Sequence, residues 1–216
     1  MKEKVKEIII KNLKWIILFI CLIGFLALAE DVFNKEIMNG DIIGYNIVSK
    51  FLISDFATPI AKAITNFGGV IFVITLSILL YILIKSRKIG LSIIINLFIA
   101  TLLNQLLKAI LQRPRPTEFR IIEEKGYSFP SGHSMVGMAF YGYLIYLIYK
   151  YIKNKYIKYG LILLLSSLIC AIGVSRIYLG VHYTSDVLGG FCIAISYLVI
   201  YISIINKFFI EKNIEN

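Results

Sequence analysis

The sequence predicts an all-α, polytopic membrane protein with six transmembrane helices and an interfacial helical segment between the first and the second. Of its 216 residues, 58% are hydrophobic and 17% charged, and the mean hydropathy is +0.80. This composition is too apolar for a water-soluble domain. Apolar runs of nearly the roughly 20 residues that cross a bilayer core fall at about residues 13–30, 67–84, 89–107, 133–151, 157–174 and 187–206.

No internal repeat, low-complexity tract or flexible linker separates these runs. Repeats and linkers are the usual signs of solenoids and of multidomain chains. We therefore expect residues 1–216 to form a single domain.

The interfacial segment is expected at residues 42–66, where polar residues alternate with an apolar stripe formed by Ile47, Phe51, Ile60 and Ile64. Pro59 is expected to divide the segment into two short helices. It could be a packed extracellular cap or a lid that admits lipid, and residue spacing does not distinguish these readings.

Basic residues account for the net charge of +10 and sort by membrane side. By the positive-inside rule, the segments that carry them are cytoplasmic, which places both termini inside and the other three connections outside. The charge is therefore a topology signal, and nucleic acid is not an expected partner. The cytoplasmic set comprises Lys2, Lys4, Lys6, Lys11, Lys14, Lys85, Arg87, Lys88, Lys150, Lys153, Lys155, Lys158, Lys207 and Lys212.

The N-terminus allows a second interpretation, because a basic stretch, an apolar run and Ala27-Leu28-Ala29 resemble a secretory signal with its cleavage site. The run from Leu13 to Ala29 is long for a signal core, so a retained span is favoured. Cleavage would leave five spans.

The three cysteines, Cys21, Cys170 and Cys192, lie in three different apolar runs. Their spacing suits neither a disulfide framework nor a zinc site. We expect small core residues.

The first polar cluster follows the third apolar run. Lys108 and Arg115 are separated by six residues, and Pro114 and Pro116 stiffen the chain where the helix must end. Both cations could therefore point into one pocket. Arg113 and Arg120 are expected to be an ordinary polar flank, and surface charge is expected to be balanced by Glu118, Glu123 and Glu124.

The second cluster, Pro130-Ser131-Gly132-His133, directly precedes the fourth apolar run. Free backbone N–H groups and the helix dipole make such a helix start attractive to phosphate. Gly132 permits close approach, Ser131 can donate a hydrogen bond and His133 can protonate a departing oxygen. The alternative is a serine cap beside an incidental histidine.

The third cluster runs from Ser175-Arg176 through His182 to Asp186. If Val181 to Gly189 begins a helix, His182 and Asp186 share a face. Asp186 can then fix the imidazole tautomer and leave the other nitrogen free to attack phosphorus. Arg176 suits two phosphate oxygens, although a structural ion pair with Asp186 is the alternative.

Together, Lys108-X6-Arg115-Pro116, Pro130-Ser131-Gly132-His133 and Ser175-Arg176-X5-His182-X3-Asp186 resemble the three-part signature of the type 2 phosphatidic acid phosphatase (PAP2) superfamily, in its membrane lipid phosphatase branch. The motifs occupy residues 108–186. The variable pair Thr184-Ser185 departs from the Pro-Thr or Pro-Ser often found there.

The resemblance implies a catalytic set of His182, His133 and Asp186, with His182 attacking phosphorus and His133 protonating the leaving oxygen. It implies a phosphate site formed by Lys108, Arg115, Ser131, Gly132 and Arg176. Side-chain cations would replace magnesium, so neither a metal nor another cofactor is expected.

The implied substrate is a lipid phosphate or pyrophosphate, held among membrane lipids at the outer face of a cell membrane, which the resemblance implies is a bacterial plasma membrane. Candidates are undecaprenyl pyrophosphate, phosphatidylglycerophosphate, phosphatidate and diacylglycerol pyrophosphate. A lipid phosphotransferase and a noncatalytic lipid-binding or transport protein are the alternatives. The sequence leaves the substrate and the oligomeric state open.

Overall fold

The structure is a computed structural model that describes residues 2–34 and 38–207. Every regular element among these residues is a helix, as the composition predicts. In chain order the helices are α1 (Lys2–Phe33), α2 (Asn39–Leu52), α3 (Ala57–Asn66), α4 (Val70–Leu83), α5 (Arg87–Leu111), α6 (Gly132–Tyr151), α7 (Lys155–Tyr178) and α8 (Thr184–Ile205).

Four helices in the described ranges, α1, α5, α7 and α8, are long and apolar enough to cross a membrane. A fifth crossing is possible if α3 and α4 are counted as one span, bent by 50° at their junction. The helix α6 falls outside this set. It carries several glycines and tyrosines and packs against α5, α7 and α8 in the middle of the bundle. The expectation of six spans is therefore not confirmed, while the multi-pass helical fold is.

The segment between α1 and α4 contains two short helices, as expected, but Pro59 does not divide them. The break falls at residues 53–56, and Pro59 lies in the first turn of α3. Proline is tolerated there because the first N–H groups of a helix have no partner within the helix. Ile47 and Phe51 on α2 point away from the protein, with 54% and 71% of their surfaces exposed.

The bend between α3 and α4 brings the chain close to His133, the predicted proton donor. A Cβ atom added to Gly68 would lie 3.2 Å from Cδ2 of His133 and 2.8 Å from Ile172. Only glycine allows this approach without a shift of its neighbours.

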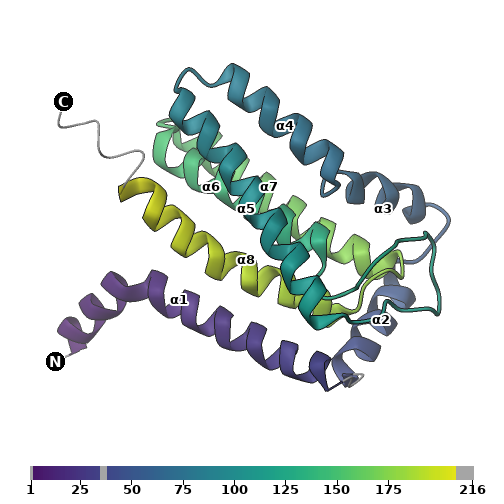
Figure 1. The fold of residues 1–216 in the computed structure, drawn as a ribbon. Helices are drawn as coiled ribbons and strands as arrows, with labels where there is room; N and C mark the ends of the chain where they lie inside the picture. The colour runs from purple at the N-terminus through teal and green to yellow at the C-terminus, as the bar shows by residue number, and fades with distance from the viewer. Residues whose placement is uncertain (1, 35–37, 208–216) are drawn as a thin grey trace.

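The long helix α1 lies along α8 (Figure 1). Phe25 stacks on Phe129, with 5.6 Å between ring centroids, and Ser196 donates a hydrogen bond to the carbonyl of Leu18. Cys21 and Cys192 interact across the same contact. Cys170 is exposed on α7, so its expected core position is wrong.

The helix α5 ends at Leu111, and the left-handed backbone of Gln112 (φ 44°) caps its last turn. Pro114 and Pro116 then prevent the helix from continuing. The chain leaves as the long loop of residues 112–131, which returns to the start of α6 at the same end of the bundle. Lys212, expected among the cytoplasmic residues, lies outside the described residues, as do the side chains of Lys2, Lys4, Lys6 and Lys11.

Candidate active site

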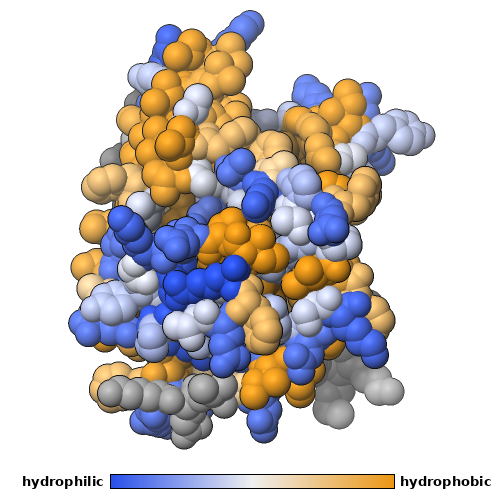
Figure 2. Space-filling view, turned by 90° about the vertical axis from the view of Figure 1, so that its right-hand side faces the viewer, coloured by the Kyte–Doolittle hydropathy of each residue, from blue (hydrophilic) through white to orange (hydrophobic). Residues whose placement is uncertain are grey.

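The three polar clusters meet at one end of the bundle, where the end of α5, the loop 112–131, the start of α6 and the turn between α7 and α8 come together beside α2 (Figure 1). Viewed from this end, hydrophilic residues gather between apolar surfaces (Figure 2). A cavity of about 670 Å³ opens here. Among the predicted site residues, its walls include Lys108, Arg115, Gly132, His133 and His182.

His182 is the buried centre of this cluster. Its Nδ1 lies 3.2 Å from Oδ2 of Asp186, and its Nε2 lies 3.0 Å from a guanidinium nitrogen of Arg115. The expected helix from Val181 is wrong, since α8 begins at Thr184. Asp186 reaches His182 because it sits in the first turn of α8 and folds back, accepting a hydrogen bond of 2.8 Å from the backbone N–H of Tyr183. The contact between His182 and Asp186 therefore joins a residue just before α8 to a residue in its first turn.

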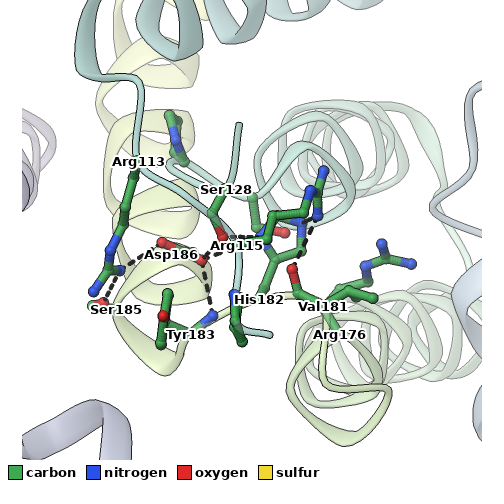
Figure 3. Close-up of polar contacts among 12 residues, drawn as sticks. Arg113, Arg115, Ser128, Arg176, Val181, His182, Tyr183, Ser185 and Asp186 are labelled. Atoms are coloured by element: carbon green, nitrogen blue, oxygen red, sulfur yellow. Dashed lines mark hydrogen bonds and ion pairs between the residues drawn. The ribbon is translucent and has the colours of Figure 1, made fainter. Parts of the chain in front are cut away.

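Asp186 is fully buried, and its two oxygens have different partners (Figure 3). Oδ2 faces His182 and accepts a hydrogen bond from the hydroxyl of Ser128. Oδ1 lies 2.7 Å from a guanidinium nitrogen of Arg113. With its oxygens shared in this way, the carboxylate has little freedom to rotate away from the imidazole.

Arg115 is held in place by backbone carbonyls. Its guanidinium donates to the carbonyl oxygens of Gly126, Lys125 and Val181, at 3.0 to 3.1 Å. Burial and the nearby charge of Arg176 lower the pKa of Arg115, and Glu124 opposes this shift. The arginine nevertheless stays charged at neutral pH. A charged Arg115 must donate to Nε2 of His182, which requires that nitrogen to be unprotonated.

The same conclusion follows from the environment of His182. Burial lowers its pKa from 6.5 to about 4; Asp186 opposes the shift, while Arg176 and Arg115 add to it. At neutral pH the ring is therefore uncharged, with its proton on Nδ1 toward Asp186 and its lone pair on Nε2. This tautomer has a nucleophilic nitrogen at the cavity.

Arg176 is fully buried behind the cavity. It donates to Thr65 at 2.8 Å and to Glu124 at 2.6 Å. Its Nε is buried without a hydrogen-bond partner among the described residues. The alternative of an Arg176–Asp186 ion pair is wrong, because each residue has another partner. Glu124 lines the cavity and does not merely balance surface charge; Arg176 helps to lower its pKa against the opposing effect of burial.

The remaining phosphate-site candidates surround the start of α6. Lys108 donates to the carbonyls of Tyr127 and Ser128, which fix its ammonium at the cavity wall. Ser131 is buried and caps the helix, accepting from the backbone N–H of Ser134 at 3.4 Å. Gly132 faces Asn104, whose Oδ1 would lie 3.2 Å from an added Cβ. The serine cap considered from the sequence is thus present beside the site.

Sequence reasoning missed three residues of this network. Ser128 carries no motif signal of its own. Arg113 is 6% exposed and bonded to two carboxylates, so its assignment to the polar flank is wrong. The second carboxylate belongs to Asp41 of α2. A single acidic residue near an apolar helix is a detectable signal, since charges at membrane depth are costly and are functional suspects.

No cluster of three or more His, Cys, Asp or Glu side chains within the described ranges is arranged to hold a metal ion.

Comparisons with known proteins agree with this architecture. The model of the PAP2 superfamily matches residues 69–210. Phosphatidylglycerophosphatase B of Bacillus subtilis is 29% identical over 184 residues, covering 79% of this chain and 86% of that protein. Undecaprenyl-diphosphatase of Sulfolobus acidocaldarius is 28% identical over 200 residues, covering 87% and 90%.

A solved structure shares the fold. The crystal structure described as the first transmembrane PAP2 type phosphatidylglycerolphosphate phosphatase from Bacillus subtilis superposes with a TM-score of 0.76 at 26% identity, covering 88% of this chain and 96% of that one. The relatives indicate a phosphatase, and the helices indicate a multi-pass membrane protein. With the family model matching well over half of its length, the chain belongs to the PAP2 superfamily.

Proposed function

We propose that this protein is a metal-independent lipid phosphatase that removes phosphate or pyrophosphate from a membrane lipid through a phosphohistidine at His182. The observation that carries the proposal is the buried imidazole of His182, which lies against Asp186 at Nδ1 and against Arg115 at Nε2, on the wall of a cavity lined by cations. A nucleophile, an orienting carboxylate and charge-stabilising groups together define a group-transfer site.

The reaction has two displacements at phosphorus. Nε2 of His182 forms a bond to phosphorus, the bond to the leaving oxygen breaks, and His133, which enters this step as imidazolium beside the bound phosphate anion, supplies the proton that this oxygen needs. His133, now neutral, then takes a proton from water. The oxygen of that water attacks phosphorus, the bond from phosphorus to Nε2 of His182 breaks, and inorganic phosphate is released. A substrate with a pyrophosphate would lose its terminal phosphate in the same way.

Positive charge supports both displacements. Lys108 and Arg115 line the cavity, and Arg176, whose Nε has no hydrogen-bond partner within the described ranges, pairs with Glu124 of the cavity wall. Cations and the backbone N–H groups at the start of α6 would hold the nonbridging oxygens, while Ser131 positions that helix start. Phosphate binding requires Arg115 to exchange its bond to Nε2 for one to a phosphate oxygen, which exposes the nucleophile at the moment the substrate arrives.

The cavity also suits an amphiphile. From the polar end it continues between α4 and α5 along apolar side chains that include Val73, Ile78, Leu97 and Phe98. This arrangement accepts a phosphate at the membrane surface and a hydrocarbon chain between two helices. We infer from the sorted basic residues that the site faces outward from the cell membrane, with both termini in the cytoplasm.

The function is tested by phosphate release from purified protein in detergent, with a panel of phosphatidate, phosphatidylglycerophosphate, diacylglycerol pyrophosphate and undecaprenyl pyrophosphate. EDTA and vanadate are added in separate reactions. Activity should persist in EDTA because chelation cannot remove side-chain cations, and vanadate should inhibit competitively as a mimic of the transferring group. Activity that EDTA abolishes and magnesium restores would contradict the mechanism.

A further inference from the structure

Arg113 lies on the side of Asp186 opposite His182 (Figure 3). One guanidinium nitrogen lies 2.7 Å from Oδ1 of Asp186 and 2.7 Å from the hydroxyl of Ser185. The other nitrogen lies 2.7 Å from Oδ2 of Asp41. The guanidinium carbon Cζ also lies 4.1 Å from the ring centroid of Tyr183. A planar fork with several fixed donors can satisfy all of these partners at once, which a lysine cannot.

Asp41 belongs to α2, 145 positions before Asp186, and is 3% exposed. Besides Arg113, it accepts a hydrogen bond of 2.8 Å from the backbone N–H of Ser185, in the first turn of α8. The carboxylate therefore caps a helix in a different part of the chain, and its negative charge interacts favourably with the positive end of the dipole of that helix. Asp41, Arg113 and Asp186 form a continuous row of alternating charge.

This row has a geometric consequence for the catalytic pair. Because Oδ1 of Asp186 is held by Arg113, Oδ2 is the oxygen left for His182 and Ser128. Without Arg113 the carboxylate could turn, and its buried charge would lose a positively charged partner, which is costly.

The row also has an electrostatic consequence. The charged and titratable groups around His182 are Asp186 on α8, Arg115 and Glu124 on the loop, Arg176 on α7, His133 on α6 and Lys108 on α5. Arg113 and Asp41 add one positive and one negative charge behind Asp186. Burial acts to lower the pKa of Arg113, but the two carboxylates outweigh it and raise that pKa. The arginine is therefore a permanent positive charge.

We propose that Arg113 and Asp41 are positioning residues for phosphoryl transfer: Asp41 holds Arg113, and Arg113 holds Asp186 in the orientation that aims His182 at the cavity and offsets the charge of that carboxylate. This role rests on the proposed function, in which His182 is the nucleophile. It also makes α2, which supplies Asp41, part of the catalytic framework. Neither residue touches the substrate.

The test uses the fact that the chain has only two histidines. Protein labelled with ¹⁵N-histidine gives one pair of ring signals for each, and a His133→Gln background leaves His182 alone. Removing positive charge in Arg113→Gln should raise the pKa of His182 by about one unit or more, since uncompensated carboxylates favour imidazolium. Removing negative charge in Asp41→Asn should shift it in the opposite direction.

Arg120→Gln is the matched control, because Arg120 is an exposed arginine of the same loop. It should leave the pKa of His182 unchanged. A purely structural role would reduce the yield of folded protein and leave the pKa of His182 in the folded fraction as it is. Absent shifts, or shifts of the same sign in Arg113→Gln and Asp41→Asn, would overturn the proposal. If Arg113→Gln does not fold, Arg113→Lys and Asp41→Asn carry the comparison, with a near-normal pKa expected in the lysine variant.

Activity provides a second, separate readout, measured with His133 intact. Arg113→Gln should lower kcat for short-chain phosphatidate at least tenfold with little change in KM, and Arg113→Lys should recover part of the loss. An increase in KM alone would place Arg113 in substrate binding and contradict a positioning role. A wild-type protein that releases no phosphate from any lipid of the panel would overturn the proposed function, whereas active wild type with unshifted variants would overturn this inference alone.

Discussion

His182 combines two properties that normally oppose each other, since it lies beside a carboxylate and yet is uncharged at neutral pH. Burial lowers its pKa to about 4, and the cations Arg176 and Arg115 add to the effect, while Asp186 opposes it. Desolvation prevails because an imidazolium would have to give up its water. The ring is therefore a nucleophile over most of the physiological range.

The first prediction follows from this pKa. In ¹⁵N-histidine-labelled protein, His182 should titrate near pH 4, well below the ordinary value of 6.5. Because the folded state binds this proton less readily than the unfolded chain, the neutral ring contributes stability above pH 6.5 that is lost as the pH falls toward about 4. Thermal denaturation across this window checks the second part. A His182 signal that titrates at or above 6.5 would contradict the assignment.

The second prediction concerns His133, which lines the cavity at the start of α6. His133→Ala should lower kcat/KM for a lipid phosphate by about 10²- to 10⁴-fold, the usual contribution of a general acid. An aryl phosphate with an activated leaving group should be affected much less, because its oxygen departs without a proton. The comparison is made by phosphate release from both substrates. Equal losses would speak against the acid role.

At this scale the sequence predicted the motif residues but only part of their surroundings. Lys108, Arg115, Gly132, His133 and His182 converge on one cavity because their motifs specify both residue type and helix ends. The partners of Arg113 could not be predicted, because Asp41 lies 72 positions away and its pairing depends on how α2 docks. Glu124 was misjudged for the same reason, its partner Arg176 being 52 positions away.

At the scale of elements, the docking of α2 against α8 depends on a close approach. A Cβ atom on Gly44 would lie 2.1 Å from Oγ1 of Thr184, the first residue of α8. This contact lies three residues from Asp41 along α2. The glycine therefore sets how near α2 can come to the turn that carries His182.

The third prediction uses two glycines of the same helix. Gly44→Ala should lower kcat by about tenfold or more, because α2 or Thr184 must shift and misplacement of about 1 Å has large effects on catalysis. Gly40→Ala is the control, since an added Cβ there meets nothing within 4 Å. It should be as active as the wild type. Phosphate release and melting temperature are measured for both. Equal activity of the two variants would contradict the positioning role of α2.

Periodicity predicted the two interfacial helices but not their division. Pro59 was expected at the break because proline disrupts helix interiors, yet the first turn accepts it. The break at residues 53–56 instead coincides with hydrogen bonds between Ser54 and Tyr178 of α7, at 3.2 Å. Such tertiary contacts override local sequence preference.

At the scale of the whole molecule, hydropathy predicted the helical membrane fold better than the number of crossings. The fourth apolar run became α6, whose tyrosines hydrogen-bond within the bundle, as Tyr143 does with Ser92 at 2.8 Å. The second run became the short α4, joined to α3 through a bend. A helix in the middle of a bundle can contain polar side chains that hydrogen-bond to neighbouring helices. These side chains lower the mean hydropathy of the helix, so hydropathy alone does not identify it as a membrane span.

The fourth prediction tests the orientation of the molecule. In a background without Cys21, Cys170 and Cys192, a cysteine replacing Lys125 beside the cavity should react with a membrane-impermeant thiol reagent from outside intact cells. A cysteine between α6 and α7 should react only after permeabilisation. Lys153 suits this second position better than Asn154, whose side chain caps α7. Reversed labelling would contradict the outward-facing site.

The central claim is that phosphate is transferred to His182, and trapping that intermediate tests it most directly. The protein is mixed with ³²P-labelled phosphatidate in EDTA, quenched in alkali within milliseconds, and the label on the protein is counted. Phosphohistidine survives alkali and is lost in acid, so the wild type should carry alkali-stable, acid-labile label and His182→Ala none. Turnover without label on the wild-type protein, or label retained in His182→Ala, would contradict the account.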